Sequence, residues 1–153
     1  MNDRLKWRMW STHAGRYFDE TNDAMLENVF ECMKQQICYD CQNPVFRKIY
    51  DRIAYNHIAD GMVFEQCTGL KDKNGKLIYE GDILRSESYP FKSDNEYHYA
   101  AEVCFDEESA VFFYYVFRTS TKVAGRAEGN TGELNECDWE IIGNIHENKE
   151  FLK

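Results

Sequence analysis

The residues best suited to metal or redox chemistry are Cys38 and Cys41, which are separated by two residues. Thiolates at this spacing suit zinc, and His57 follows at a distance that zinc fingers use. A finger needs a second histidine about three to five residues further on, and none is present there. The pair also falls at the end of an expected helix, which disfavours a thioredoxin-like site. We therefore interpret these cysteines as reduced thiols and expect no cofactor or metal, with zinc as the alternative.

Catalytic side chains form no recognisable set. The four histidines are scattered, and no serine lies in a Gly-x-Ser-x-Gly motif. Glu80 and Asp82 could form a carboxylate pair, but their position around Gly81 favours a role in a turn. We assign no catalytic or binding residues and expect that the protein is not an enzyme.

The segment Thr68–Arg85, TGLKDKNGKLIYEGDILR, is the most patterned part of the chain, and it could be a ligand-binding loop or a hairpin. A phosphate-binding loop requires Ser or Thr after its lysine, and Lys76 is followed by leucine. A calcium loop centred on Gly75 would place Leu70 at its first ligand position. Both ligand-binding interpretations fail.

A hairpin explains more of the same residues. Asn74-Gly75 is typical of a type I′ turn, in which both central residues have positive φ. Gly81 interrupts the following strand and indicates a bulge, and Asp82 is placed to hold the turn. We therefore predict that the glycines serve backbone geometry rather than a ligand.

Two types of element are expected to position these residues. Apolar side chains recur at helical spacing after a cap at Thr21 or Asn22, and a second helix begins at Asn43-Pro44, which predicts an αα-hairpin over about residues 22–60. Alternating patterns predict strands elsewhere. These strands are Leu5–Trp10, Arg16–Phe18, Met62–Cys67, Leu77–Leu84, Tyr99–Phe105, Ala110–Arg118 and Glu140–His146, with polar loops at 86–97 and 120–135.

The run Val111–Phe117, VFFYYVF, is apolar on both faces of its predicted strand. Such a strand lies in the centre of a sheet that is covered on both sides. The helical hairpin or another subunit could cover the second side, and an uncovered side would favour aggregation. We therefore expect a homo-oligomer.

Composition excludes several partners. The chain has 153 residues, a net charge of −9 and a pI of about 4.9, so it has no general attraction for nucleic-acid phosphates or anionic membranes. It has no apolar run that could span a bilayer, and its N-terminus has no signal-peptide pattern. We expect a protein of the cytoplasm, with no membrane partner.

Three segments together resemble the YopX family of uncharacterised phage and prophage proteins. They are Leu5–Trp10 (LKWRMW), Thr68–Leu84 (TGLKDKNGKLIYEGDIL) and Ile141–Leu152 (IIGNIHENKEFL). The sequence departs from the family pattern at Ser11, His146 and Lys149. The resemblance implies a phage origin, a bacterial host cell and a mostly β fold. It implies no reaction and no catalytic residues.

The sequence thus predicts an α+β fold in a single domain, 1–153. A small antiparallel β-barrel or bent sheet would carry the αα-hairpin at about 22–60 and a β-rich part at 62–153. We expect a non-enzymatic module for protein interaction or assembly, with a phage or host protein as a further partner. A nucleic-acid-binding module is the alternative, and an enzyme is third. Binding of nucleic acid would use Lys71, Lys73 and Lys76 with Tyr79 and Tyr97.

Overall fold

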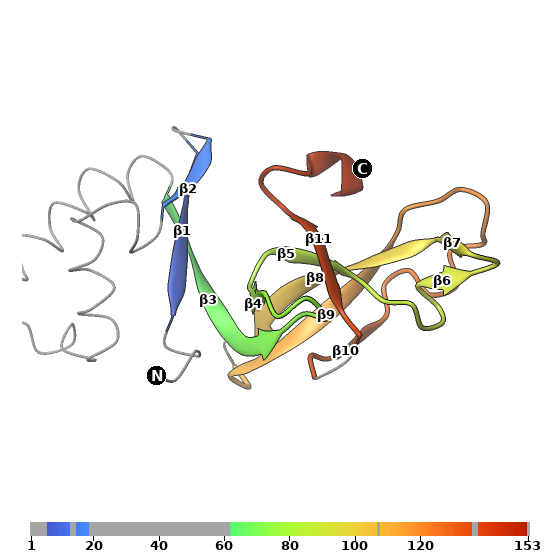
Figure 1. The fold of residues 1–153 in the computed structure, drawn as a ribbon, viewed down its shortest axis with the longest axis horizontal. Helices are drawn as coiled ribbons and strands as arrows, with labels where there is room; N and C mark the ends of the chain where they lie inside the picture. Colours follow the sequence, from blue (N-terminus) through green and yellow to red (C-terminus); the bar gives the residue numbers. More distant parts are fainter. Residues whose placement is uncertain (1–5, 13–14, 19–61, 107, 136–137, 153) are drawn as a thin grey trace, which may run out of the picture. The chain divides into compact units, whose positions relative to one another are not determined.

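The computed structural model describes residues 6–12, 15–18, 62–106, 108–135 and 138–152. The chain divides into two compact units, Met1–Cys67 (unit 1) and Thr68–Lys153 (unit 2), whose strands are drawn in Figure 1. The boundary falls within strand β3 (Met62–Lys71), so the first residues of this strand belong to unit 1 and the last to unit 2.

In unit 1, strand β1 (Trp7–Ser11) pairs antiparallel with β2 (Arg16–Phe18) and with the first part of β3. The pairing places Arg8 opposite Glu65, and Arg8 Nε lies 2.6 Å from Glu65 Oε2. The Tyr17 hydroxyl donates to the same oxygen over 3.1 Å. Glu65 is only 1% exposed, so these contacts offset the cost of burying its carboxylate.

Unit 2 begins with a hairpin between the end of β3 and β4 (Leu77–Tyr79). The Gly75 N–H donates to the Asp72 carbonyl over 2.9 Å, and the Asp72 N–H donates to the Lys76 carbonyl over 2.8 Å. Gly75 has a φ of 82°, whereas Asn74 is not in the positive-φ region. The loop is therefore a type I turn followed by a left-handed glycine. The predicted hairpin is confirmed, but the predicted type I′ turn is wrong, because the loop has one residue more than that turn.

The larger sheet of unit 2 has five antiparallel strands in the order β10-β9-β8-β5-β11 and curves as a half-barrel (Figure 1). Its strands are β5 (Asp82–Arg85), β8 (Tyr99–Asp106), β9 (Val111–Arg118), β10 (Thr131–Glu133) and β11 (Glu140–Asn144). A separate two-stranded sheet joins β6 (Lys92–Ser93) and β7 (Glu96–Tyr97). β6, β7 and β10 lie where polar loops were predicted, and that prediction is wrong for these short strands.

Alternation gives the five-stranded sheet two different faces. The core face is built from Leu84, Ala101, Val103 and Val116, which are buried with Phe91, Tyr99, Leu134 and Trp139. The opposite face, here called the second face, consists of Ile83, Arg85, Ala100, Glu102, Cys104, Asp106, Val111, Phe113, Tyr115, Phe117, Thr131, Glu133, Glu140 and Ile142. On that face Ile83, Ala100 and Phe117 are buried, with Ile142 and Ile145 packed against them. Strand β9 is apolar toward both faces, as its sequence predicts, but it lies between β10 and β8, and β8 is the central strand of the sheet.

The predicted fold class, α+β, is wrong. Strands make up 53% of the described part, and its sole helical element is the 3-10 turn η4 (Lys149–Leu152). The helical contribution to the prediction rested entirely on the αα-hairpin at about 22–60, which lies outside the described residues. Segments of the remaining sequence alternate with a period of two and form strands, so the described part of the chain is nearly all β.

Candidate functional site

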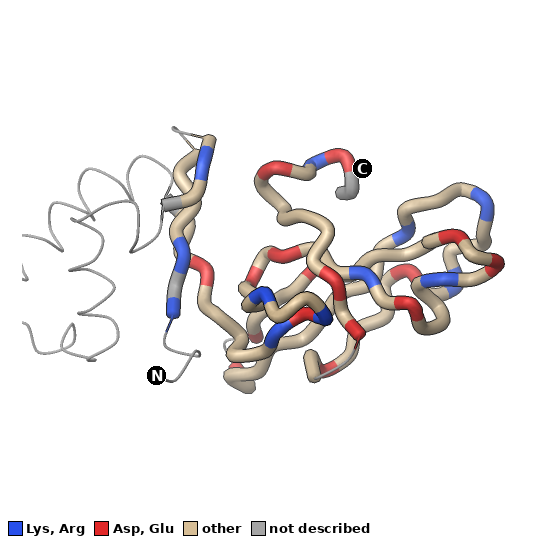
Figure 2. The backbone as a smooth tube through the Cα atoms, viewed as in Figure 1, with Lys and Arg blue, Asp and Glu red and all other residues tan. Residues whose placement is uncertain are grey.

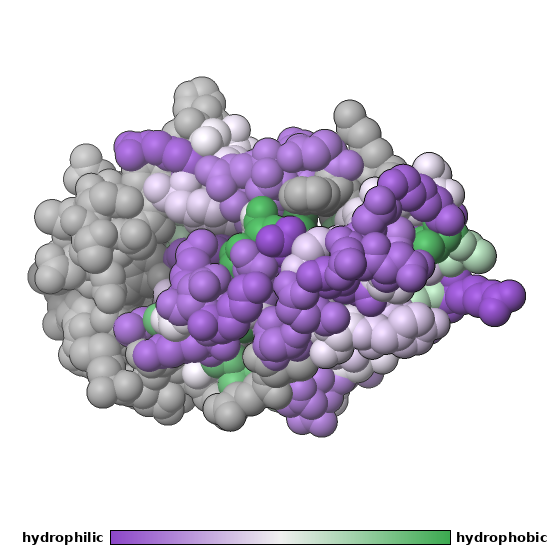
Figure 3. Space-filling model, turned by 45° about the vertical axis from the view of Figure 1, so that its right-hand side comes forward, coloured by the Kyte–Doolittle hydropathy of each residue, from purple (hydrophilic) through white to green (hydrophobic). Residues whose placement is uncertain are grey.

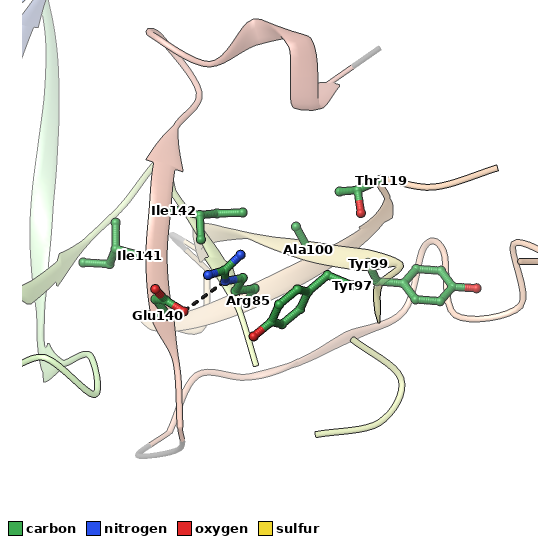
Figure 4. Close-up of a pocket in the computed structure, with 8 residues that line it drawn as sticks. All are labelled: Arg85, Tyr97, Tyr99, Ala100, Thr119, Glu140, Ile141 and Ile142. Atoms are coloured by element: carbon green, nitrogen blue, oxygen red, sulfur yellow. Dashed lines mark hydrogen bonds and ion pairs between the residues drawn. The ribbon is translucent and has the colours of Figure 1, made fainter. Parts of the chain in front are cut away.

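A pocket of about 430 Å³ lies at one end of the second face (Figure 4). Strands β5, β7, β8 and β11 and the residue after β9 supply its walls. The lining residues are Arg85, Tyr97, Tyr99, Ala100, Thr119, Glu140, Ile141 and Ile142. We call this the Arg85 pocket, because Arg85 is the one cation among the residues that line it.

The Arg85 side chain is held on two sides. Its Nε donates to Glu140 Oε2 over 3.0 Å, and its guanidinium carbon lies 4.2 Å from the centre of the Tyr97 ring. Antiparallel pairing of β5 with β11 places Arg85 directly opposite Glu140, which is why the two side chains meet. Figure 4 shows the guanidinium beside Glu140 and the Tyr97 ring. The arrangement fixes the orientation of a group that is otherwise flexible.

Glu140 is shared by two cations. Besides Arg85, Lys73 reaches it, with Nζ 2.8 Å from Glu140 Oε2. The hydrogen bond from Arg85 and then that from Lys73 lower the pKa of Glu140. Two positive groups therefore face one carboxylate. The Asp72–Lys76 loop brings Lys73 here, since the Lys73 N–H donates to the Trp139 carbonyl over 2.8 Å.

The Tyr97 ring also contacts a second charge pair. Lys92 Nζ lies 4.9 Å from the ring centre and forms a salt bridge with Glu87, and the Tyr97 hydroxyl donates to the same carboxylate. The hydrogen bonds from Lys92 and then Tyr97 lower the pKa of Glu87. Figure 2 shows basic and acidic segments interspersed through unit 2, which agrees with this local pairing of charges.

Toward its other end, the second face becomes aromatic. Val111 and Tyr115 are 41% and 42% exposed, and Phe113 between them is half-buried. Glu102 lies opposite Tyr115 on the neighbouring strand, and burial raises the pKa of its carboxyl group. On the side of the molecule that Figure 3 displays, the described surface is mostly hydrophilic with small hydrophobic patches. An exposed apolar stretch on such a surface is a candidate contact site.

Two acidic residues of Thr68–Arg85, Asp72 and Asp82, support the backbone. Asp72 is buried, and its carboxylate accepts from the Asn74 and Lys76 N–H groups over 2.9 Å each and from the Ile141 N–H over 3.3 Å. Asp82 is also buried and accepts from the Tyr79 N–H over 2.8 Å. The predicted turn role of Asp82 is confirmed.

The cysteines of the described part carry no sign of metal chemistry. Cys67 is buried and Cys104 is half-buried, while Cys38, Cys41 and His57 lie outside the described residues, so the prediction of reduced thiols stays a prediction. Burial, with Glu102 and Glu80 nearby, raises the pKa of the Cys104 thiol to about 11. Within the described ranges, no group of three or more His, Cys, Asp or Glu side chains is arranged to hold a metal ion.

Sequence reasoning named Tyr97 and Lys73 but missed Arg85, Glu140 and Thr119. Arg85 and Glu140 lie 55 residues apart, and only the strand register brings them together. A pairing of opposite charges across strands would have identified them, had the order β5-β11 been known. Of the lysines proposed for nucleic-acid binding, Lys73 is paired with Glu140, while Lys71 and Lys76 are exposed.

The described residues are nearly all β, and those of unit 2 form a curved antiparallel sheet with a charged pocket. The chain belongs to the YopX family, because residues 6–153 match the YopX protein family, essentially the whole chain. It also resembles the crystal structure of protein EF1440 from Enterococcus faecalis, with 31% sequence identity and a TM-score of 0.38. That match covers 65% of this chain and 62% of the other, so the chain spans less than two thirds of that protein.

No curated protein matches the chain. In the described residues, no helix is long and apolar enough to cross a membrane.

Proposed function

We propose that this protein is a phage- or prophage-encoded accessory protein that acts in the bacterial cytoplasm by binding other protein chains, without catalysis. Its main partner in this proposal is a second copy of the same chain. The observation that best supports this proposal is that Val111 and Tyr115 are exposed on β9, whose opposite side is packed into the core. The phage origin rests on the resemblance of the three sequence segments to the YopX family.

The contact would be made by side chains. β9 pairs with β8 along its whole length and with β10 at Phe113–Tyr115, so its backbone is already used within the sheet. An aromatic side chain can bury roughly 150–250 Å², and a few such residues form the anchor of an interface. A two-fold contact between Tyr115 and Phe113 of two copies supplies this anchor, and closed two-fold dimers are the commonest assembly.

Charge opposes this contact through the net charge of each copy and through Glu102, Asp106 and Glu133, which the register places opposite Tyr115, Val111 and Phe113. Each copy carries a net charge of −9, so two copies repel at low salt. At physiological salt the screening length is about 8 Å, which leaves the short-range burial of aromatic surface to dominate. We therefore expect association to strengthen as salt rises from low to physiological concentration.

A nucleic-acid partner is the second candidate, and the charge pairing disfavours it. Lys73 and Arg85 face Glu140, and Lys92 faces Glu87. The Tyr97 ring has Arg85 and Lys92 over it, so a base would have to displace a cation to stack there. A salt-dependent gel-shift assay with single- and double-stranded DNA and RNA should show no retardation at physiological salt.

Light scattering coupled to sizing tests the self-association. At micromolar concentration and physiological salt, we expect twice the chain mass of 18.1 kDa. The variant Tyr115→Glu should give a single chain mass. Tyr89→Glu is the matched control, because Tyr89 is 84% exposed outside the second face and receives the same charge change. A wild-type mass of 18.1 kDa, or equal effects of the two variants, would contradict the proposal.

A further inference from the structure

The Arg85 guanidinium is held through its Nε atom, and its two terminal nitrogens can contact a ligand. Among the residues that the structure describes, Glu140 is its sole hydrogen-bond acceptor, reached through Nε. The two terminal nitrogens of the guanidinium are left for a ligand, and the side chain is 33% exposed where it borders the pocket. A guanidinium held in this way presents a planar fork that matches the two oxygens of a carboxylate.

The local charge also favours an anion. Arg85 and Lys73 share the single carboxylate of Glu140, which leaves one positive charge in excess, while Lys92 and Glu87 balance each other. This excess is small, and the chain as a whole is acidic. A singly charged group is therefore a better match than a phosphate dianion, which would call for more cations.

The other residues that line the pocket favour a ligand whose part away from the carboxylate is apolar. Ala100 and Ile142 give an aliphatic surface, and the ring of Tyr97 adds aromatic surface. Thr119 contributes a hydroxyl group that can donate or accept a hydrogen bond. The volume of about 430 Å³ is in the range of small-molecule sites, which combine apolar walls with a few polar anchors.

From this geometry we propose that the Arg85 pocket binds a monocarboxylate with an apolar body, whose carboxylate is held by the terminal nitrogens of Arg85. Two sources share this chemistry, a free aromatic or aliphatic acid and the C-terminal residue of a protein chain. The site is separate from the exposed aromatic end of β9, so it does not depend on the proposed self-association.

Nuclear magnetic resonance titration of the full chain tests the site. The probes are phenylacetate, its neutral isostere phenylacetamide, and the peptide acetyl-Ala-Phe with a free or an amidated C-terminus. We expect saturable shifts of the Ala100 and Thr119 amides and of Arg85 Nε–H with the two acids, with a Kd on the order of 1 mM for phenylacetate. The two amides should bind at least about tenfold more weakly.

Matched variants test whether Arg85, rather than another cation, binds the carboxylate. Arg85→Gln should weaken phenylacetate binding about tenfold or more, and Arg118→Gln, the same change at an exposed arginine that lies 3.8 Å from Glu128, should not. If Arg85→Gln does not fold, Thr119→Tyr keeps Arg85, fills the pocket from an exposed position and should also abolish binding.

Three results would overturn the proposal: no saturable shift up to about 20 mM acid, equal binding of acids and amides, or inorganic phosphate bound as tightly as phenylacetate. Tighter binding of the free-acid peptide than of phenylacetate supports the site and assigns it to a protein C-terminus. The reverse order supports the site and assigns it to a free acid. Tyr115→Glu should leave all these affinities unchanged, so failure here is distinguishable from failure of the self-association.

Discussion

The two faces of the five-stranded sheet are made by the same strands, yet their side chains are satisfied in different ways. On the core face, the Trp139 ring lies 5.2 Å from Phe91 and 5.3 Å from Tyr114, and its Nε1 donates to the Asn135 carbonyl over 3.2 Å. On the second face, Arg85 and Tyr115 stay partly exposed. One alternating pattern thus supplies stability on one side and leaves a surface for recognition on the other.

Removing one aromatic ring from each face is the strongest test of this difference between the two faces. Trp139→Ala should lower the free energy of unfolding by about 3–5 kcal/mol, because it deletes a ring that is packed against two others. Phe113→Ala on the second face should cost about 1 kcal/mol, because Phe113 is only half-buried. Urea denaturation measures both. Equal losses would mean that the second face is as much a part of the core as the first.

A backbone change should lower stability without touching the second face. Gly75→Val places a β-branched residue at a φ of 82° and should cost about 1–3 kcal/mol. No atom lies within 4 Å of an added Cβ, so the cost is conformational rather than steric. Gly75→Asn is the control and should cost less, because asparagine tolerates this region. The melting temperature reports the loss, while the dimer fraction per folded molecule should stay constant. A Gly75→Val protein with normal melting would contradict the turn assignment.

The smallest effect concerns Glu102 on the second face. Burial raises the pKa of its carboxyl group, so the charged form is less stable in the folded than in the unfolded protein. Its contribution to stability is therefore fully present below the unfolded pKa and is lost as pH rises through the raised folded pKa. Glu102→Gln should raise the free energy of unfolding at pH 7 by up to about 1 kcal/mol and change it little at pH 3. A variant that is less stable at pH 7 would show that the carboxylate has a favourable partner.

Most strands could be predicted because their patterns are local. Val111–Arg118 alternates between two apolar faces, and Gly81 has a φ of 77° where the sequence predicted an interruption. The short strands β6, β7 and β10 could not be predicted in the same way, because sequences such as Lys92–Ser93 have no apolar side to mark a face. Their pairing comes from the chain that surrounds them.

The pocket was less predictable than the strands. Its central pair, Arg85 and Glu140, comes from strands that are far apart in the sequence and adjacent in the sheet. Nothing local distinguishes these two residues from other charges at strand ends. The type I turn at Lys73-Asn74 illustrates the same limit on a smaller scale, since Asn-Gly marks a hairpin but tertiary contacts to Ile141 and Trp139 accompany the longer loop.

Oxidative footprinting of tyrosines at two protein concentrations tests the central claim most directly, because it locates the contact as well as detecting it. We predict that Tyr115 becomes several-fold less reactive when the concentration rises from nanomolar to tens of micromolar at physiological salt, while Tyr89, which is exposed away from the second face, keeps its reactivity. Equal reactivity of Tyr115 at both concentrations would show that the second face makes no contact between copies.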